Sequence, residues 1–371
     1  MASGSDAVSV LDEHGAIRPT PAAEPYADRA LAVPVEQRVG FLRDMVLTRV
    51  FDVGAANLQR QGQLALWVQS YGQEAAQVGS ARATRAQDSV FPAYREHAVG
   101  MIRGLDPIEI IKLYRGLVHG AWDPAANGNF HQYCLVIGSQ TLHATGYAMG
   151  LQLDGATATG DPERDEAVVV YFGDGASSQG DTNEALVFAA SYATPQLFFI
   201  QNNHWAISVP AERQSRVPLA QRASGFGMPG VRIDGNDVLA TYAVTRALLD
   251  DARAGRGPAL IEALTYRIGG HSSSDDPTKY RSDEELARWG ERDPILRLRR
   301  HLESEGVGAE VFDGLDAEGA DLAADVRRRT LELPDPPMSD MFEHVYSEPH
   351  PLMEAQLQWL RDYEASYGGV R

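Results

Sequence analysis

The order of apolar and polar positions predicts an α/β domain in the middle of the chain. Residues 168–172 and 197–201 have the length and the β-branched or aromatic content of buried strands, and an amphipathic helical segment lies between them. A Gly-Asp-Gly cluster at 173–175 follows the first strand, and an Asn-Asn pair at 202–203 follows the second. Ligands of open α/β sheets bind at the carboxyl ends of parallel strands. We therefore expect the two polar clusters to lie side by side in a binding site.

The same pattern adds strands to the sheet and helices around it. Residues 231–238 and 258–267 predict a third and a fourth strand. The segment 134–153 begins as an apolar strand or turn and continues as a helix of small residues. Apolar residues recur at helical spacing over 35–61 and 107–120, and the segment 73–86 predicts a helix of small residues that packs closely on a neighbour. Acidic and arginine-rich helical patterns dominate from residue 284 onward.

Strands that alternate with helices over roughly 90–270 predict the fold class. It is α/β, a doubly wound and mainly parallel sheet with helical N- and C-terminal extensions. Residues 1–34 are rich in Ala, Pro, Ser and Asp, and we expect a flexible or surface-draped arm there. The α/β domain is expected over 35–300 and the C-terminal helical extension over 301–371.

Charge and composition exclude several classes of partner. The net charge of −18 argues against a nucleic acid or an anionic membrane surface, because both need a basic face. No apolar run approaches the length of a membrane span, and the N-terminus lacks the apolar core of a signal peptide. The single cysteine, Cys134, excludes an intrachain disulfide and is typical of a reducing compartment. We expect a cytoplasmic protein.

The strand-end residues predict a cation that carries a diphosphate. The glycine turn lacks the G-x-G-x-x-G spacing of dinucleotide sites and the Gly-Lys-Ser/Thr of a Walker loop. Gly-Asp-Gly alone is a common turn, and its pairing with Asn-Asn is what favours a site. Asp174, the carboxamide of Asn203 and a nearby backbone carbonyl are oxygen ligands of the kind that Mg²⁺ prefers, with phosphate oxygens and a water completing the octahedron.

Two other polar stretches have alternative interpretations. Tyr94 and Arg95, at a predicted strand-to-helix junction, suit phosphate oxygens, but in isolation a surface salt bridge beside a satisfied histidine, His97, is the commoner case. His271 precedes three serines and two aspartates. Such a run is also typical of a helix cap before Glu284.

Five stretches taken in order resemble one enzyme family. Gly-Asp-Gly followed, after a helix and a strand, by Asn-Asn is similar to the thiamine diphosphate signature. The five stretches are PAYREH, GDGASSQGDTNEA, QNNHWAIS, RIDGNDV and TYRIGGHSSSDDPTKYRS. Together they resemble the alpha subunit of the decarboxylating component of 2-oxo acid dehydrogenase complexes, over about residues 35–294.

The resemblance implies thiamine diphosphate and Mg²⁺ as cofactors and gives residues their roles. Asp174, the side chain of Asn203 and the carbonyl of Trp205 become Mg²⁺ ligands. Tyr94 and Arg95 are similar to a pair that holds the diphosphate, Gly175 and Ala176 to residues that present backbone amides to it, and Leu135 and Ile137 to positions whose backbone meets the aminopyrimidine. The cofactor-binding residues implied are thus Tyr94, Arg95, Leu135, Ile137, Asp174, Gly175, Ala176, Asn203 and Trp205.

Two histidines become candidate catalytic residues through the same resemblance. His271 resembles an active-site histidine near the thiazolium that assists the acylation of lipoate. His97 stands where pyruvate-type members carry a histidine. His131 has a counterpart in the family as well, but the spacing from His131 to Gln140 is shorter here.

The family pattern also implies partners. One α/β unit leaves room for a diphosphate-binding domain and none for the pyrimidine domain that thiamine enzymes need. We therefore expect a separate beta subunit that supplies a glutamate and half of the pocket, in an α₂β₂ heterotetramer. The acyl group from the 2-oxo acid substrate is expected to pass to a lipoyl-bearing acyltransferase core.

The substrate and the class of function have alternatives. The stretch TYRIGGHSSSDDPTKYR is closer to the branched-chain type, whereas His97 favours the pyruvate type, and acetoin is a third possibility. A non-catalytic regulatory or scaffold subunit of the same fold is the alternative from another class. Loss of Asp174, Asn203 or Arg95 would be its signature, and all three are present.

Overall fold

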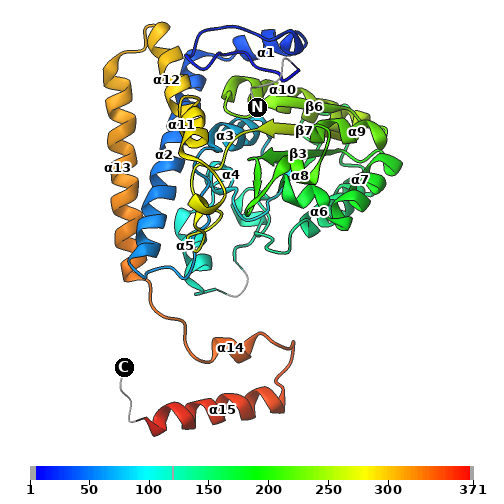
Figure 1. Cartoon of the computed structure of the whole chain (residues 1–371). Coiled ribbons are helices and arrows are strands. Elements are labelled where there is room, and N and C mark those ends of the chain that lie inside the picture. Colours follow the sequence, from blue (N-terminus) through cyan, green and yellow to red (C-terminus); the bar gives the residue numbers. More distant parts are fainter. Residues whose placement is uncertain (1–5, 119–120, 368–371) are drawn as a thin grey trace.

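A five-stranded parallel sheet organises the chain (Figure 1). The computed structural model describes residues 6–118 and 121–367. The strands lie in the order β1-β2-β3-β7-β6, and each neighbouring pair is parallel. Their bounds are Ser89–Phe91 for β1, Val168–Gly173 for β2, Gln196–Asn202 for β3, Gly230–Asp234 for β6 and Ala259–Leu264 for β7. The four predicted strands are thereby confirmed.

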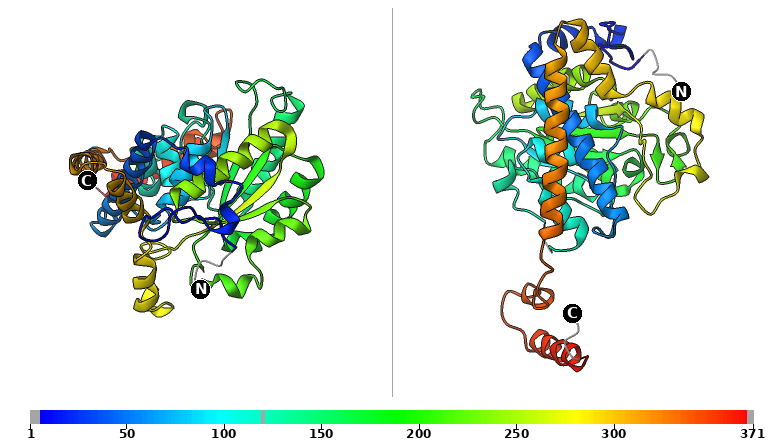
Figure 2. Two further views of the ribbon diagram at one scale, coloured as in Figure 1. Left: turned by 90° about the horizontal axis from the view of Figure 1, so that it is seen from above. Right: turned by 90° about the vertical axis from the view of Figure 1, so that its left-hand side faces the viewer.

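Helices cover both faces of the sheet, so the doubly wound class is confirmed (Figures 1 and 2). Alternate residues of β2 point to opposite faces, and Val169 and Tyr171 enter one apolar cluster while Val168 and Val170 enter the other. The first cluster includes side chains of α2 (Val35–Arg60), α3 (Glu74–Ala83) and α10 (Val238–Asp251). The second includes α6 (Ser139–Leu153), α7 (Gly180–Tyr192) and α9 (Arg222–Gly225).

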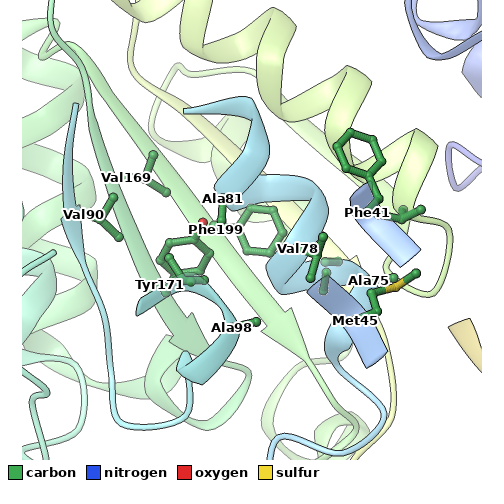
Figure 3. Close-up of a cluster of buried hydrophobic side chains, with 14 of the residues drawn as sticks. Phe41, Met45, Ala75, Val78, Ala81, Val90, Ala98, Val169, Tyr171 and Phe199 are labelled. Atoms are coloured by element: carbon green, nitrogen blue, oxygen red, sulfur yellow. The ribbon is translucent and has the colours of Figure 1, made fainter. Parts of the chain in front are cut away.

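The small residues of α3 allow close packing, as the sequence predicted. Figure 3 shows Ala75, Val78 and Ala81 of this helix in the cluster that contains Tyr171 and Phe199 of the sheet. A Cβ on Gly79 of α3 would lie only 2.7 Å from the Thr241 Cβ of α10, so glycine is needed where these helices approach.

The remaining elements connect and extend this core. A two-stranded antiparallel pair, β4 (Trp205–Ala206) and β5 (Val209–Pro210), follows β3. The other helices are α1 (Ala27–Leu31), α4 (His97–Ile102), α5 (Pro107–Arg115), α8 (Ala211–Gln214), α11 (Asp283–Gly290), α12 (Pro294–Ser304), α13 (Ala309–Glu332), α14 (Asp340–Glu343) and α15 (Pro351–Ser366). Among the described residues, no helix combines the length and the apolar composition needed to cross a membrane.

Residues 6–34 of the N-terminal segment, where we expected a flexible or surface-draped arm, pack against the domain. Val8 adds to the edge of the sheet: its N–H donates to Arg232 at 2.8 Å, and its carbonyl accepts from Asp234 at 2.9 Å. Val8 and Leu11 are buried. Because small apolar residues alternate here, the segment can pair alongside β6, and that pairing holds it against the domain.

The C-terminal helices divide into a packed part and a projecting part. α13 lies along α2, whereas α14 and α15 extend away from the body of the domain (Figures 1 and 2). No residue of α15 is buried. Residue 301, our predicted start of the extension, lies inside α12. The division into an α/β domain and an extension remains a prediction.

Candidate active site

A cavity of about 330 Å³ opens at the carboxyl edge of the sheet. The register pairs Gly173 of β2 with Gln201 of β3, so Asp174 and Asn203 follow the ends of neighbouring strands. The two polar clusters meet as the sequence predicted. Nine predicted site residues line the cavity: Tyr94, Arg95, Ile137, Asp174, Gly175, Ala176, Asn203, Trp205 and His271.

Asp174 provides a buried carboxylate in this cavity. Its side chain is 2% exposed, and its Oδ2 accepts a hydrogen bond from Gln214 at 3.3 Å. Burial raises the pKa of Asp174 to about 6, and Arg267 and Gln214 offset only part of that effect. A buried carboxylate without full compensation is stabilised in its ionised form by a bound cation, so the residue fits a metal site.

A sharp turn brings Asn203 and Trp205 to the same cavity. His204 between them has a φ of 70°, a left-handed conformation that histidine tolerates better than most residues. The Asn203 amino group donates to Gln73 Oε1 at 2.7 Å, and its oxygen accepts from the Trp205 N–H at 3.2 Å. The Trp205 carbonyl accepts from Arg267 at 2.9 Å, which leaves one lone pair for another donor or a cation.

Gly175 is required where β2 turns toward the cavity. A Cβ at this position would lie 2.8 Å from the Cβ of Ala206, next to the Trp205 turn. A short 3₁₀ helix, Gly175–Ser178, begins here and contains the buried Ala176. The glycine therefore lets the two strand-end loops approach each other closely.

Arg95 links the cavity to the loop that carries His271. Its guanidinium donates to the carbonyl of Gln69 and, at 2.9 Å, to the carbonyl of His271. It also lies over the ring of Tyr94, 5.6 Å from the ring centroid. The cation is nearly buried and faces the cavity, which is the setting in which a guanidinium binds phosphate oxygens.

His271 is a neutral imidazole at the cavity wall. The backbone N–H of His271 donates to the Asp275 carboxylate at 2.6 Å, and this bond holds the loop in place. Burial, together with the nearby Arg95 and Arg267, lowers the pKa of His271 to about 4. At neutral pH the ring can therefore accept a proton or a hydrogen bond. The helix cap that was its alternative role belongs elsewhere, because Ser282 caps α11.

The structure does not bring His97 into the cavity lining. Its ring is fully buried, lies 4.6 Å from the Trp67 ring in a stacked arrangement, and contacts the Tyr133 hydroxyl and the Val68 carbonyl, each at 2.8 Å. Burial lowers its pKa to about 3. The catalytic role expected for His97 stays a prediction, and this position does not support it, because α4 begins at His97 and turns the side chain into the core.

Two more predicted residues lie outside the cavity lining. Leu135 is 67% exposed, whereas Ile137, two residues later, lines the cavity. His131 stacks on Phe91 with ring centroids 3.8 Å apart, and burial lowers its pKa. His131 therefore packs on the end of β1 rather than facing the cavity.

Sequence reasoning missed three glutamines and one glutamate that also line the cavity. They are Gln73, Glu96, Gln201 and Gln214. The only sequence signal is proximity, because Glu96 follows Arg95 and Gln201 precedes the Asn-Asn pair. Gln73 immediately precedes α3, 130 residues before Asn203, so no local pattern connects the two.

No group of three or more His, Cys, Asp or Glu side chains could hold a metal ion in residues 6–118 and 121–367. The predicted Mg²⁺ ligands would not form such a group, since they comprise one carboxylate, one carboxamide and one carbonyl. The buried Asp174 and the oriented Asn203 are consistent with a metal held partly by its ligand.

Comparison with known proteins decides the family. The model of the family described as "Dehydrogenase E1 component" matches residues 42–321. The chain belongs to the dehydrogenase E1 component family. The resemblance found in the five motifs is thereby confirmed, and membership implies thiamine diphosphate as the cofactor.

Individual E1 relatives align over most of the chain. The 3-methyl-2-oxobutanoate dehydrogenase subunit alpha of Mycobacterium tuberculosis (strain ATCC 25618 / H37Rv) is 44% identical over 350 residues, 92% of this chain and 91% of the relative. The pyruvate dehydrogenase E1 component subunit alpha of Staphylococcus aureus (strain Mu50 / ATCC 700699) is 38% identical over 305 residues, 82% of this chain and 78% of the relative.

Proposed function

We propose that this chain is the alpha subunit of a branched-chain 2-oxo acid dehydrogenase. The observation that carries the proposal is the cavity that joins Asp174, Asn203, Arg95 and His271 at one sheet edge, in a member of the E1 family. The 44% identity to a 3-methyl-2-oxobutanoate dehydrogenase subunit favours branched-chain substrates. The reaction is oxidative decarboxylation, with transfer of the acyl group to a lipoyl group of the acyltransferase core.

Mg²⁺ and the diphosphate bind at the strand ends in this proposal. Asp174, the Asn203 carboxamide oxygen and the Trp205 carbonyl hold the metal, and the raised pKa of Asp174 supports the need for a cation beside it. Arg95 and Tyr94 hold the diphosphate, with Gly175 and Ala176 offering backbone amides. When bound, thiamine diphosphate supplies the carbon nucleophile and the electron sink for loss of CO₂.

His271 acts next to the reacting centre. Its imidazole is neutral at pH 7, because burial and two arginines lower its pKa. It can therefore hold a proton transferred during acylation of the lipoyl group. The contact between Arg95 and the His271 carbonyl keeps the ring at the cavity wall.

A beta subunit completes the pocket. The curated relatives named above are alpha subunits. Apolar side chains on the outer surface of α6 and α7 support such a partner, and we call this surface the partner face: Tyr147, Leu153, Val187, Phe188 and Tyr192. The exposed Leu135 and Val136 extend it toward Ile137 at the cavity. The expected assembly is α₂β₂.

Pyruvate is the second candidate substrate, favoured by the 38% identity to a pyruvate dehydrogenase subunit. Steady-state rates of the chain purified with its beta subunit, measured with 3-methyl-2-oxobutanoate and with pyruvate, separate the two. We expect kcat/KM at least tenfold higher for the branched substrate. A preference for pyruvate would overturn the branched-chain assignment and retain the family.

A further inference from the structure

A chain of buried hydrogen bonds runs along the wall of the cavity from Asn203 to Glu96. The Asn203 amino group donates to Gln73 Oε1 at 2.7 Å, and Gln73 Nε2 donates to Gln201 Oε1 at 3.1 Å. Gln201 Nε2 then donates to Glu96 Oε1 at 2.6 Å. Gln77 joins from α3, with its Nε2 3.2 Å from Gln201 Oε1. All of these side chains are buried.

Backbone groups fix which end of each amide is oxygen. The N–H of Trp205 donates to Asn203 Oδ1, so the amino group of Asn203 must face Gln73. The N–H of Ala98 donates to Gln77 Oε1 at 3.1 Å, so the amino group of Gln77 must face Gln201. Because the identity of a backbone donor is unambiguous, the direction of the chain follows from the fold.

The direction of the chain requires an acceptor at Glu96. Gln201 Oε1 receives the amino groups of Gln73 and Gln77, so the amino group of Gln201 points to Glu96. The other oxygen of Glu96 accepts the N–H of Arg95 at 3.2 Å. Two donors thus converge on one side chain, and an ionised carboxylate accepts each of them at a separate oxygen.

We propose that Glu96, Gln201 and Gln73 are positioning residues for the metal-diphosphate site. They fix Asn203 so that its oxygen, which keeps one lone pair beside its bond from the Trp205 N–H, faces the cation in place of the amino group. They fix the backbone of Arg95 at the same time. This inference rests on the proposed function, in which Asn203 binds Mg²⁺. None of the three needs to touch the cofactor to have this effect.

Glu96→Gln keeps the size of the side chain but leaves one acceptor oxygen where two donors need one each. The donor-to-acceptor order of the hydrogen-bond chain is then broken. Its single oxygen can accept from Gln201 or from the Arg95 N–H, and its amino group then faces the other donor. Either Gln201 or Arg95 must move. Loss of a partner behind a metal ligand typically weakens metal affinity about 10–100-fold, and we expect a loss in that range.

The test measures Mn²⁺ affinity by electron paramagnetic resonance with saturating thiamine diphosphate, on the full chain in the assembly in which it purifies. The decisive variant combines Glu96→Gln with Gln201→Glu. The carboxylate at 201 then accepts from Gln73, Gln77 and the new amide at 96, whose oxygen accepts from Arg95. The pair restores the direction, so we expect affinity within about threefold of the parent protein.

Glu262→Gln is the matched control. Glu262 is buried and accepts from Asn202 at 2.8 Å, the same kind of bond one residue away, but does not line the cavity. We expect unchanged Mn²⁺ affinity. Thermal melting verifies that each variant is folded. Should Glu96→Gln fail to fold, Gln73→Met, which leaves the Asn203 amino group without its acceptor, tests the same link and is expected to weaken affinity at least tenfold.

Two results would overturn the inference: parental affinity in Glu96→Gln or Gln73→Met, or no recovery in the double variant. The proposed function fails separately if Asn203→Ala binds Mn²⁺ as tightly as the parent protein. Loss in Asn203→Ala with parental affinity in Glu96→Gln would keep the metal site and reject the positioning chain.

Discussion

Single residues in the cavity and in the core beside it are held in protonation states that burial determines. Asp174 is a buried acid with a raised pKa. His97 is a buried base and His271 a half-buried one, and both have lowered pKa values. The raised pKa of Asp174 suits a cation site. The lowered pKa values of His97 and His271 keep both imidazoles neutral at pH 7.

Asp174→Asn is expected to stabilise the protein without cofactor or metal. The rise in pKa from 3.8 to about 6 makes the folded state bind protons more tightly than the unfolded state, so ionisation destabilises the fold above pH 6. At about 1.4 kcal/mol per pKa unit, removal of the charge should raise the free energy of unfolding by about 3 kcal/mol at pH 8. It should leave that free energy unchanged below about pH 3.8. Urea unfolding of the parent protein and the variant, at pH 8 and below about pH 3.8, measures this difference in the free energy of unfolding.

Asp234→Asn is the control for that measurement. Asp234 is equally buried, but Arg297 and Arg292 hold its pKa below the ordinary value. The same substitution there should destabilise the protein at pH 8. Equal effects of the two variants would contradict the assignment of Asp174 as an uncompensated charge.

His97→Leu tests the buried position of His97. The change leaves the Val68 carbonyl and the Tyr133 hydroxyl without partners, which costs about 2–4 kcal/mol at pH 8. Because the pKa of His97 is about 3 in the folded protein and about 6.5 in the unfolded chain, its contribution falls as pH drops below 6.5. The difference between parent and variant should shrink by about 2 kcal/mol between pH 6.5 and pH 5. A constant difference would mean that His97 titrates normally.

At the scale of elements, the sequence predicts what depends on local pattern. Apolar runs that end at Gly-Asp-Gly and Asn-Asn predicted β2, β3 and their shared edge, because strand length and polarity are local properties. The inward turn of His97 and the Gln73–Asn203 contact depend on packing between distant segments, which no local pattern encodes. The pairing of Val8 with β6 was missed for the same reason, since it needs a free sheet edge.

Asp237 joins two elements, and its loss should release one of them. Its Oδ1 accepts from Leu239 and Ala240 at the start of α10, and its Oδ2 accepts from Val10 and Leu11, each at 2.7 Å. Asp237→Ala should cost about 3 kcal/mol or more and speed proteolytic cleavage within residues 6–34. Ser282→Ala, which removes only the cap of α11, should cost about 1 kcal/mol and leave cleavage there unchanged. Equal cleavage in both variants would contradict the role of Asp237.

At the scale of the whole molecule, one edge of the sheet provides the proposed cofactor residues, and the adjacent helices provide an apolar surface. The partner face on α6 and α7 lies on the sheet face opposite α2, α3 and α10. This arrangement suits a site shared between two subunits.

Phe188→Glu on the partner face should prevent assembly with the beta subunit. A charge there would have to be buried in the interface without a partner. Leu331→Glu, at an exposed apolar position on α13, is the control and should assemble normally. Co-purification and light scattering distinguish the two. Normal assembly of Phe188→Glu would exclude α7 from the interface.

The central claim is that this cavity binds thiamine diphosphate through Mg²⁺. Calorimetric titration of thiamine diphosphate into the assembly, with Mg²⁺ and with a chelator in its place, tests it most directly. We predict binding at micromolar or lower concentration only with Mg²⁺, and none in Asp174→Asn under either condition. Equally tight binding with the chelator present, or in Asp174→Asn, would contradict the account.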